Sequence, residues 1–407
     1  MKETPSMNTS DFFKISTPVD FFDFGRMPIA NGFGPKDAEV NTFHMVADFF
    51  EELKLVKLRE QPENIEMFNE NYAFFTGTSQ GMIAHFERTA NQLAKRLSWN
   101  RNSTILEIGC NDGTFLKHVK RYSLNVRGIE PSKNVANAAQ EKNIDIDVEF
   151  FGSDYSMLDF FTNQVDTIYA ANVICHIPDV LDVMMTAKKV LKKSGYFVFE
   201  DPYLGSMLSA GSFDQIYDEH AYIFSVEAVQ KLAMQCGLTL VDCEWLPTHG
   251  GSMRYYLQNS DEKANYRVEQ WLEYEALLIT PTTFSTFKDT CAFGKKLMQN
   301  AMRVFSEENL IVEGLGATSK STTILNYYEL DVNHISTIYD NSPGKIGKFT
   351  PKTNIPIKSD TSFGNVKPDI LFLFAWNHEK EIRNKYYDKL SETKIITHLK
   401  KDFETLI

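Results

Sequence analysis

Short β-rich runs alternate with helix-length stretches along this chain, and no other feature of the sequence constrains its fold as strongly. In the middle of the chain the runs are STILEIG, VRGIE, VDTIYAAN and GYFVFED. Strands that alternate with helices form βαβ units, which assemble into a parallel sheet with helices on its faces. A second series follows nearer the C-terminus, with the runs NLIVEGLG, HISTIYD and PDILFLFAW. The sequence therefore predicts an α/β fold with two such regions.

The same patterns divide the 407 residues into three predicted domains. Residues 1–88 are irregular and rich in aromatic side chains, with turn signals in PIANGFGPKD, and they form a small N-terminal domain. Residues 89–258 contain the first α/β series. Residues 259–407 begin with a helical linker, up to about residue 310, and continue into the second α/β series. A chain of this length is long enough to form two or three cores.

The composition limits the partners and the compartment. The chain has 54 acidic and 42 basic residues, a net charge of −12, which argues against a general nucleic-acid surface but not against a local pocket for a small anion. No apolar run approaches the roughly 18 residues of a membrane span, and the N-terminus does not have the pattern of a signal peptide. The five cysteines are scattered and include no CxxC pair, so we expect a reducing, cytoplasmic location without disulfides.

One glycine loop predicts a ligand site in the middle domain. In TILEIGCNDGTFLKHV a strand ends near Glu107, and Gly109, Asn111, Asp112 and Gly113 lead into a helix. Glycines allow a tight turn and a close approach of the backbone to a ligand, and the helix N-terminus offers amides. The spacing E-x-G-x-x-x-G differs from the dinucleotide pattern G-x-G-x-x-G and lacks a P-loop lysine. The loop alone is equally compatible with a glycine turn of any α/β protein.

The next strand, in NVRGIEPS, ends at Glu130, where a carboxylate can accept hydrogen bonds from both hydroxyls of a ribose. Together with the glycine loop and the strand that ends in YAAN, this acid resembles the S-adenosylmethionine site of Rossmann-like methyltransferases. The resemblance implies S-adenosyl-L-methionine as the cofactor and S-adenosyl-L-homocysteine as the product. It further implies that Asp154, in FGSDYS, lies near the adenine and that Asn172 lies near the reactive sulfonium.

A cluster of titratable side chains predicts general-base chemistry. The stretch FDQIYDEHAYIFS places Tyr217, Asp218, Glu219 and His220 side by side. Methylation of a carbon needs a base that removes a proton made acidic by a neighbouring ketone, and neutral histidine suits this role near pH 7. Glu219 could orient His220, and Tyr217 could donate a hydrogen bond to an enolate oxygen. The plainer alternative is a helix start with a solvated acidic turn.

His176, in ANVICHIPD, follows the strand that ends at Asn172 and is therefore expected in the same cleft. A lone histidine of this kind is more often a satisfied core or surface residue, so this alternative stays open for His176 taken by itself. Two histidines near one predicted cofactor cleft favour a functional role.

A longer run, FEDPYLGSMLSAGSFDQIYDEHAYIFSVEAVQKLAMQCGLTLVDCEWLPTHGGSMRYYL, resembles the sugar C-methyltransferases of deoxysugar biosynthesis. The resemblance continues in MPIANGF, MFNENYAFFTGTSQGMIAHF, EIGCNDGTFL, GLGATSKSTTILNYY, IYDNSPGKIGKFTPKTNIPI and LFAWNHEKEI, so it spans nearly the whole chain in the family's order. Enzymes of this family methylate C3, or in some cases C5, of nucleotide-linked 4-keto-6-deoxysugars. The resemblance implies that His220 is the base and that Tyr217, Glu219 and His176 are the other catalytic residues.

A second glycine loop, in VEGLGATSKS, repeats the strand–loop–helix pattern near the C-terminus. Gly316 permits a close approach of the backbone, while Thr318, Ser319 and Lys320 offer donors at a helix start. This arrangement predicts a binding site for a diphosphate. In the family that the chain resembles, the C-terminal domain closes over the nucleotide sugar, so the cleft between the two α/β regions would hold both substrates.

Further candidates for substrate binding lie outside this loop. The strand ISTIYD ends in Tyr339 and Asp340, which could hold the base and the ribose of a nucleotide. In THGGSMRYY, His249 and Arg254 lie near the predicted domain junction. Arg254 could bind a phosphate with two hydrogen bonds, or it could form an ordinary surface ion pair. Asn377, in AWNHEKE, follows a strand and is a candidate for a contact with the sugar.

The chain departs from the family at two places. Family members usually begin with a zinc-binding domain built on two cysteine pairs, whereas the first cysteine here is Cys110, and Phe50 and Leu53 stand where the second pair would fall. Apolar side chains cannot bind zinc but can form a small core in its place, so no zinc is expected. In NYAFFTG the chain keeps Tyr72, a substrate-binding candidate, but has two phenylalanines where the family tends to have a tyrosine pair.

The sequence thus predicts an S-adenosylmethionine-dependent C-methyltransferase of a nucleotide-linked keto-deoxysugar, acting as a monomer without a nucleic-acid or membrane partner. An N- or O-methyltransferase of an amino or hydroxyl sugar would share the cofactor site but need a weaker base. A non-catalytic nucleotide-sugar binding protein would fit the missing zinc cysteines, but not the combination of Tyr217, Glu219 and His220. The sequence does not determine the nucleotide, the sugar or the methylated carbon.

Overall fold

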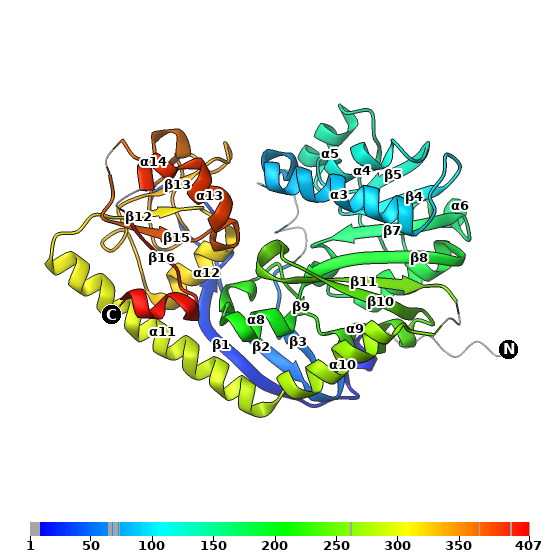
Figure 1. Cartoon of the computed structure of the whole chain (residues 1–407), viewed down its shortest axis with the longest axis horizontal. Coiled ribbons are helices and arrows are strands. Elements are labelled where there is room, and N and C mark those ends of the chain that lie inside the picture. Colours follow the sequence, from blue (N-terminus) through cyan, green and yellow to red (C-terminus); the bar gives the residue numbers. More distant parts are fainter. Residues whose placement is uncertain are drawn as a thin grey trace.

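The computed structural model describes residues 9–63, 67, 72, 74–260, 263–365, 367–390 and 393–406. The outer ends of the first and last predicted domains, residues 1–8 and 407, lie outside this range. The described residues form two α/β lobes side by side, with the N-terminal strands and two successive helices beneath them (Figure 1). No helix among them is both long and apolar enough to cross a membrane.

The larger lobe is built on a seven-stranded sheet with the strand order β10-β11-β8-β7-β4-β5-β6. Neighbouring strands are parallel except at β11, which runs antiparallel to both β8 and β10. The strands predicted in STILEIG, VRGIE, VDTIYAAN and GYFVFED are confirmed as β4, β5, β7 and β8. The bounds are β4 Thr104–Ile108, β5 Asn125–Ile129, β6 Asp145–Asp147, β7 Val165–Ala171, β8 Leu191–Pro202, β10 Thr239–Leu246 and β11 Ser252–Gln258.

Helices cover both faces of this sheet, as the doubly wound pattern requires. In α3 the buried side chains include Met82, Phe86, Ala90 and Leu93, which recur at the helical spacing and pack into the core of the sheet. The expected domain boundary after residue 88 therefore falls inside α3, because this helix packs as a whole on the larger lobe. The helices are α3 Gln80–Arg96, α4 Thr114–Val119, α5 Lys133–Gln140, α6 Leu158–Phe161, α7 Val180–Val190 and α9 Val226–Gln235.

The smaller lobe contains an all-parallel five-stranded sheet with the order β14-β13-β12-β15-β16. Its strands are short and almost entirely apolar where they are buried on both faces, as expected for parallel strands covered by helices. The elements are β12 Val312–Leu315, α12 Ser319–Tyr328, β13 Ile338–Asp340, β14 Ile357–Ser359, β15 Ile370–Leu373, α13 Glu379–Lys385, α14 Tyr387–Leu390 and β16 Lys394–Ile396.

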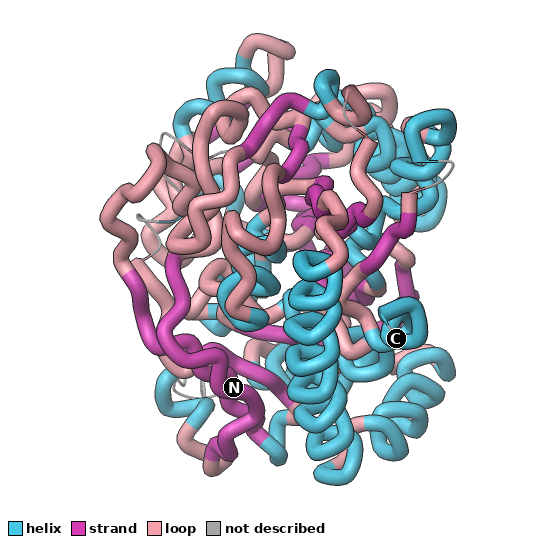
Figure 2. The backbone as a smooth tube through the Cα atoms, turned by 90° about the vertical axis from the view of Figure 1, so that its left-hand side faces the viewer, coloured by secondary structure: helices cyan, strands magenta, loops and turns pink. Residues whose placement is uncertain are grey.

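Two helices join the lobes, as predicted for residues 260–310. These are α10, Tyr266–Leu278, and α11, Pro281–Glu307. The start of α11 follows from its sequence, since the Thr280 side chain accepts a hydrogen bond from the Thr283 amide and Pro281 occupies the first turn. Figure 2 shows α11 beside the long N-terminal strands.

The N-terminal segment forms a four-stranded sheet with the order β1-β2-β3-β9. The fourth strand, β9, is Tyr222–Ile223 and comes from the segment that follows His220, so the N-terminal segment is tied directly to the predicted base. Phe50 and Leu53, where the family's cysteines would fall, are buried, and the Phe50 ring lies 5.1 Å from the ring of Phe13. The remaining elements are α1 Thr9–Phe13, β1 Pro18–Pro28, β2 Thr42–Phe50 and β3 Leu55–Leu58.

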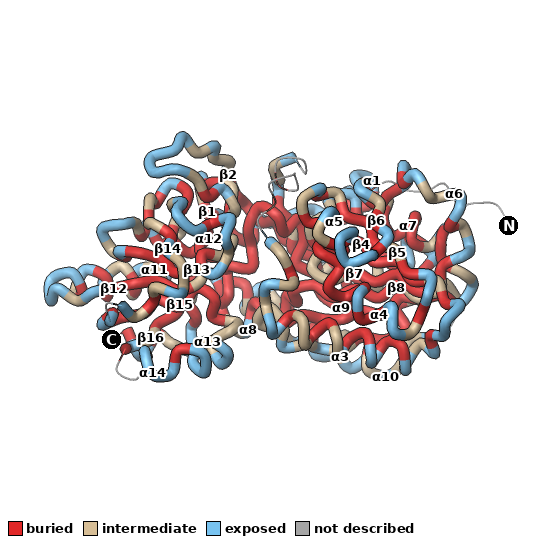
Figure 3. The backbone as a smooth tube through the Cα atoms, turned by 90° about the horizontal axis from the view of Figure 1, so that it is seen from above, coloured by how far each residue is buried: buried red, intermediate tan, exposed pale blue. Residues whose placement is uncertain are grey.

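One segment of the larger lobe packs into the core of the smaller one. Helix α8, Leu204–Ala210, and the 3-10 turn Phe213–Gln215 follow β8 in the chain. Their apolar side chains, with Phe213 among them, share a core with Met298 of α11 and Ile324 of α12. Buried backbone accordingly continues through the junction between the lobes (Figure 3).

Candidate active site

A cavity of about 410 Å³ opens between the two lobes, a size typical of a small-molecule site. Both glycine loops lead into it. In each sheet the loop follows the strand at which the order of the strands reverses. This strand is β4, between β5 and β7, in the larger sheet and β12, between β13 and β15, in the smaller one. Ligands of open α/β sheets bind at the carboxyl ends of the strands at such switch points. The cavity therefore joins two predicted ligand sites.

The first glycine loop is shaped by its neighbours. Gly109 has a φ of +63°, and a Cβ at this position would lie 2.4 Å from Cγ2 of Val173, so only glycine fits. Asn111 also has a positive φ, 51°. Its side chain accepts a hydrogen bond from the Thr76 amide at 2.9 Å and donates one to the Phe74 carbonyl at 3.0 Å. The segment before α3 is thereby fixed against the loop.

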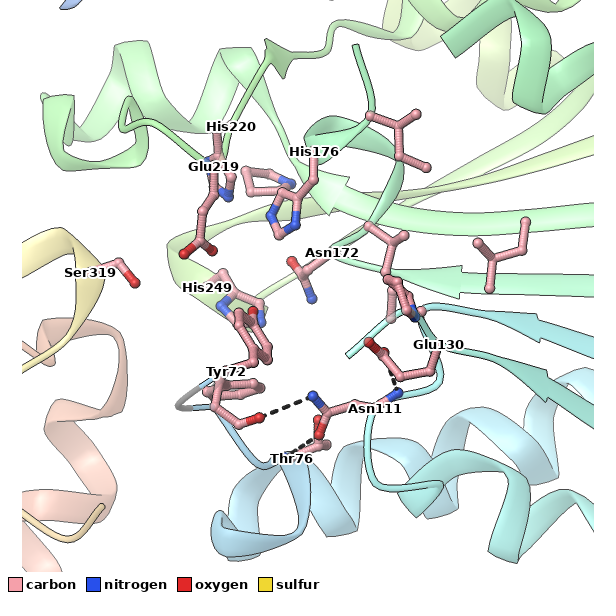
Figure 4. A pocket seen from close by; sticks show the side chains of 18 of the residues that line it. Tyr72, Thr76, Asn111, Glu130, Asn172, His176, Glu219, His220, His249 and Ser319 are labelled. Atoms are coloured by element: carbon pink, nitrogen blue, oxygen red, sulfur yellow. Dashed lines mark hydrogen bonds between the residues drawn. The ribbon is translucent and has the colours of Figure 1, made fainter. Parts of the chain in front are cut away.

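Glu130 lies at the end of β5 with its carboxylate buried against the loop (Figure 4). One oxygen accepts from the Asn111 amide at 3.0 Å and the other from the Ser132 amide at 2.8 Å. Burial raises the pKa of Glu130, although these amides act to lower it. Each carboxylate oxygen keeps a second lone pair, so the group can also accept two hydroxyl protons, as the ribose of S-adenosylmethionine would require.

The predicted cofactor residues divide into two layers. The cavity is lined by Gly109, Asn111, Glu130, Asp154 and Asn172.

The second layer, behind the lining, contains Glu107, Asp112 and Gly113. Within the described residues, Oε2 of Glu107 has no hydrogen-bond partner, and burial with Asp112 and Glu130 nearby raises its pKa well above the usual range. Asp112 accepts from the Gly77 amide at 3.0 Å and from Thr114 Oγ1 at 2.6 Å, and Lys142 pairs with it at 3.2 Å.

The predicted base, His220, is buried and has a defined hydrogen bond. Its Nδ1 lies 2.6 Å from the main-chain carbonyl oxygen of Gln215. A carbonyl can only accept, so Nδ1 carries the proton and Nε2 carries the lone pair. Burial lowers the pKa of His220 well below the usual 6.5, and the nearby His176 lowers it further. The imidazole is therefore neutral at pH 7 and able to accept a proton.

Two predicted partners of His220 lie against it. The His176 ring is 5.1 Å from the His220 ring, and the Tyr217 ring is 4.2 Å away. Burial lowers the pKa of His176 to about 4 and raises the pKa of Tyr217 well above its usual value, so both are neutral near pH 7. In Figure 4, His176 and Asn172 lie between His220 and the cofactor residues Asn111 and Glu130.

Glu219 does not orient His220, which corrects one expectation. Its carboxylate accepts from the side chain of Asn31, in the N-terminal segment, while the Gln215 carbonyl holds His220. Burial, with Asp218 adjacent, raises the pKa of Glu219 to about 8, and burial raises the pKa of Asp218 to about 7. Glu219 points into the cavity, toward the side occupied by Ser319 (Figure 4). It can therefore contact a substrate directly.

The second glycine loop presents cations. Gly316 has a φ of +94°, and a Cβ there would lie 2.6 Å from Cβ of Ala375. Thr318 caps α12 by accepting from the Ser321 amide at 3.2 Å. Thr318, Ser319 and Lys320 line the cavity. Gly316 itself lies behind them.

Two buried lysines give this end of the cavity its charge. Nζ of Lys320 has no hydrogen-bond partner among the described residues and lies 5.7 Å from the centre of the Trp376 ring. Lys345 donates to the Ala317 carbonyl at 2.8 Å and also lines the cavity. Burial lowers the pKa of both lysines. An anion such as a diphosphate would satisfy these charges and the amides at the start of α12.

Arg254 is not a ligand-binding residue in this structure. It lies in β11 with 1% of its side chain exposed, and its guanidinium pairs with Glu200 at 3.0 Å and with Glu244 at 2.6 Å. These acids are its direct cross-strand neighbours on β8 and β10. Neither predicted alternative is correct, because the ion pair is buried rather than exposed and the guanidinium has no group left for a phosphate.

The other predicted substrate-binding residues fall into two groups, those that line the cavity and those that do not. Tyr72, His249 and Asn377 line the cavity. Tyr339 and Asp340 do not line it. The Tyr339 hydroxyl donates to Glu313 at 3.1 Å, and Asp340 accepts from the Ser342 amide at 2.8 Å.

Sequence reasoning missed several lining residues. Asn31 and Lys345 lie in MPIANGF and IYDNSPGKIGKF, two runs that carry the family resemblance, so the signal was present. Further missed lining residues include Phe74, Thr76, Glu149, Phe150, Gln215 and His378.

One group of side chains has metal-ligand character. The ligand atoms of Cys175, His176 and His220 lie within 4.8 Å of one another. A metal would need the Cys175 thiolate, but burial raises the pKa of this thiol well above its usual value.

Comparison with known proteins finds family matches to two successive parts of the chain. Residues 82–242 match a methyltransferase domain, and residues 247–399 match a C-methyltransferase C-terminal domain. The C-methyltransferase NovU of Streptomyces niveus is 25% identical over 372 residues, which cover 89% of this chain and 88% of NovU. The sterol 24-C-methyltransferase ERG6 of Saccharomyces cerevisiae is 24% identical over 59% of this chain and 63% of its own length.

Among solved structures, the magnesium protoporphyrin IX methyltransferase of Synechocystis with bound S-adenosylhomocysteine is 13% identical with a TM-score of 0.35. The superposition covers 44% of this chain and 84% of that enzyme. A methyltransferase of Thermotoga maritima is 18% identical with a TM-score of 0.34, over 44% of this chain and 91% of its own. The two family matches and the strand order of the larger sheet, rather than these structures, show that the chain combines a Rossmann-like methyltransferase domain, whose cofactor is S-adenosylmethionine, with a C-methyltransferase C-terminal domain.

Proposed function

We propose that this protein transfers a methyl group to a carbon beside the ketone of a nucleotide-linked 4-keto-6-deoxysugar, with C3 as the position. The observation that carries the proposal is the state of His220, a buried neutral imidazole whose Nδ1–H is bonded to a carbonyl. A carbon nucleophile, unlike an amine, has no lone pair until a proton is removed, and Nε2 of His220, left free by the Nδ1–H bond, lies at the cavity to accept that proton.

The proposed reaction uses the chain's own residues as follows. Bound S-adenosylmethionine supplies an electrophilic methyl group. Nε2 of His220 accepts the proton on the sugar carbon, and the carbonyl of Gln215 stabilises the resulting imidazolium through Nδ1–H. Tyr217, and Glu219 in its protonated form, can donate to the enolate oxygen. Holding the enolate carbon and the methyl group in line would supply much of the rate acceleration.

Charge supports the proposed substrate. The end of the cavity nearest α12 carries Lys320, Lys345 and the helix N-terminus, which suit a diphosphate. The end nearest β4 and β5 carries Glu130, which suits hydroxyls. A nucleotide-linked sugar bound by its diphosphate at α12 would place its sugar ring toward Glu219 and His220, across the cavity in Figure 4.

Two of these relatives have carbon as the methyl acceptor by name. NovU is named a C-methyltransferase and ERG6 a sterol 24-C-methyltransferase, and the second matched domain is described as that of C-methyltransferases. We extend the reaction type to this chain. The sugar substrate is proposed from the family resemblance together with the charge of the cavity.

We further propose that the enzyme works in the cytoplasm as a monomer, with a zinc-free N-terminal domain. Metal analysis of the purified protein tests the last point, and one zinc per chain would contradict it. Light scattering tests the monomer, and a mass of two chains or more would contradict that.

Deuterium exchange tests the reaction directly. The protein is incubated in heavy water with S-adenosylhomocysteine and a nucleotide-linked 4-keto-6-deoxyhexose. We expect exchange at one carbon beside the ketone, and loss of that exchange in His220→Asn. His44→Asn is the matched control, because His44 is an exposed histidine of β2. No exchange in the wild type, with the cofactor product bound, would contradict the proposal and favour an amino or hydroxyl acceptor.

A further inference from the structure

The turn that holds the base is anchored in the opposite lobe from the cofactor. Phe213, the first residue of this turn, is buried with its ring 4.9 Å from Tyr327, 5.3 Å from Tyr328 and 5.1 Å from His398. All three partners belong to the smaller lobe. The position of the turn is therefore set by the domain that would bind the nucleotide, although the turn follows β8 in the chain.

Asp214, the next residue, is fully buried and uses both of its carboxylate oxygens in the smaller lobe. Oδ2 accepts from the indole Nε1 of Trp376 at 2.7 Å, and Oδ1 accepts from Nε2 of His398 at 2.8 Å. Burial alone would raise the pKa of Asp214, but His398, Lys320 and Trp376 outweigh it and leave the pKa below its usual value. A charged carboxylate buried with two directed donors holds its backbone firmly.

Gln215 connects this carboxylate to the base. Its main-chain carbonyl accepts from Nδ1 of His220 at 2.6 Å, and its side chain donates to the His249 carbonyl at 2.6 Å. Because the carbonyl that fixes the tautomer of His220 is one residue from Asp214, a shift of Asp214 must shift the imidazole as well.

The same carboxylate also faces the anion-binding end of the cavity. Nζ of Lys320 lies over the ring of Trp376, and the charge of Asp214 acts to raise the pKa of Lys320 against the larger lowering by burial. Trp376 packs against Gly250, where any Cβ would lie 1.9 Å from the indole. The indole thus contacts Lys320, Gly250 and Asp214.

We propose that Asp214, held by Trp376 and His398, is a positioning residue that aligns His220 for proton abstraction and ties the base to the anion-binding lobe. This inference rests on the proposed role of His220 as base. It assigns to the Asp214–Trp376–His398 cluster an effect on the rate of proton removal, separate from binding of the cofactor.

Trp376→Phe is the main test, because it keeps an aromatic ring and removes the indole hydrogen bond to Asp214 while the His398 bond remains. Trp99→Phe is the matched control. Trp99 is equally buried, and its indole donates to Thr167 at 2.9 Å in the larger lobe. Asp214→Asn is the second variant, since an amide has one acceptor oxygen and cannot serve both donors.

We expect Trp376→Phe to lower the deuterium exchange rate at saturating sugar about 10- to 100-fold, the size of effect that a misplaced base produces. Affinity for S-adenosylhomocysteine should stay within about twofold of the wild type. Trp99→Phe should exchange at the wild-type rate. Equal exchange rates in the two tryptophan variants would overturn the proposal. If Trp376→Phe fails to fold, the same comparison is made with Asp214→Asn.

A second readout separates this inference from the proposed reaction. In protein labelled with ¹⁵N-histidine, the signals of His220 are assigned by their loss in His220→Asn. The wild type should show a proton fixed on Nδ1, and Trp376→Phe should show the two ring nitrogens exchanging that proton. An unchanged His220 spectrum in Trp376→Phe would reject the positioning role, even if no sugar tested supports exchange. A changed spectrum would support it, whatever the substrate proves to be.

Discussion

The two glycine loops have the same backbone plan and opposite chemistry. Each follows the strand at the switch point of its sheet, each contains a glycine with a positive φ, and each begins a helix. The loop after β4 is surrounded by the carboxyl groups of Glu107, Asp112 and Glu130. The loop after β12 is surrounded by the amino groups of Lys320 and Lys345.

This difference teaches that the fold provides a ligand site and the nearby charges choose the ligand. S-adenosylmethionine presents an ammonium and ribose hydroxyls, whose hydrogen bonds carboxylates can accept, and a sulfonium, whose charge they can balance. A diphosphate presents only acceptors and negative charge, which lysines and helix amides can bind. The two loops should therefore respond to mutation independently, each with its own ligand.

The largest expected effect is on cofactor binding, at the loop after β4 with its carboxyl groups. Glu130→Gln replaces a carboxylate that accepts two amide hydrogen bonds with a group that has one acceptor oxygen. Hydrogen bonds to charged groups contribute about 1.5–3 kcal/mol each, so we expect S-adenosylhomocysteine to bind about 100-fold more weakly by calorimetry. Nucleoside diphosphate binding should not change. Glu141→Gln, at an exposed glutamate after α5, is the control. Equal affinity in the two variants would show that Glu130 does not bind the cofactor.

A substitution at the loop after β12 should weaken binding of the diphosphate instead of the cofactor, and by a smaller factor. Lys320→Met removes a charge but keeps most of the side-chain volume, and Lys345 remains to bind the anion. We expect nucleoside diphosphates to bind about 10-fold more weakly and S-adenosylhomocysteine to bind as before. Lys296→Met, on the exposed face of α11, should change neither. If Lys320→Met weakens both ligands equally, the two loops are not independent sites.

The glycines test whether the shared backbone plan is needed. Gly109→Ala and Gly316→Ala would each force a positive φ on a side chain and place Cβ 2.4 Å from Val173 or 2.6 Å from Ala375. We expect each to cost about 1–3 kcal/mol in the free energy of unfolding, measured in urea. Gly25→Ala is the control, since its φ is +73° with nothing within 4 Å of the Cβ, so it measures backbone strain alone. A loss no larger than that of Gly25→Ala would mean that the neighbours give way.

The loops and the place of His220 in the cavity were predictable because their signals are local. A strand followed by glycines and a helix start predicts each loop, and adjacent titratable residues predicted His220. The same reasoning failed for contacts between distant segments. Asn31 bonds to Glu219 across 188 positions of the chain.

The prediction for Arg254 failed for the same reason. It pairs with Glu200 and Glu244 only because three strands align in register. A sequence pattern does not contain that register.

Hydrogen bonds to main-chain groups could not be predicted from the sequence either. The Gln215 carbonyl, which fixes the tautomer of His220, depends on the geometry of one turn rather than on any side chain. Likewise, burial decides the charge of Glu219, and burial follows from the packing of both lobes. The residue types at the site could be predicted, but the partners and protonation states that give them their roles could not.

The smallest expected effect is on the pH dependence of exchange. It should connect the proposed base His220 to the loop after β12 and not to the loop after β4. Because burial lowers the pKa of His220, the imidazole stays neutral as the pH falls from 8 through 6.5, and the exchange rate should stay level over this range. A fall with its midpoint at the ordinary 6.5 would contradict a buried base. The charge of Lys320 also lowers this pKa, after burial and His176. Lys320→Met should therefore move the acid limb of the rate profile to slightly higher pH, whereas Glu130→Gln should move it less, because Glu130 is not among the largest influences on the pKa of His220.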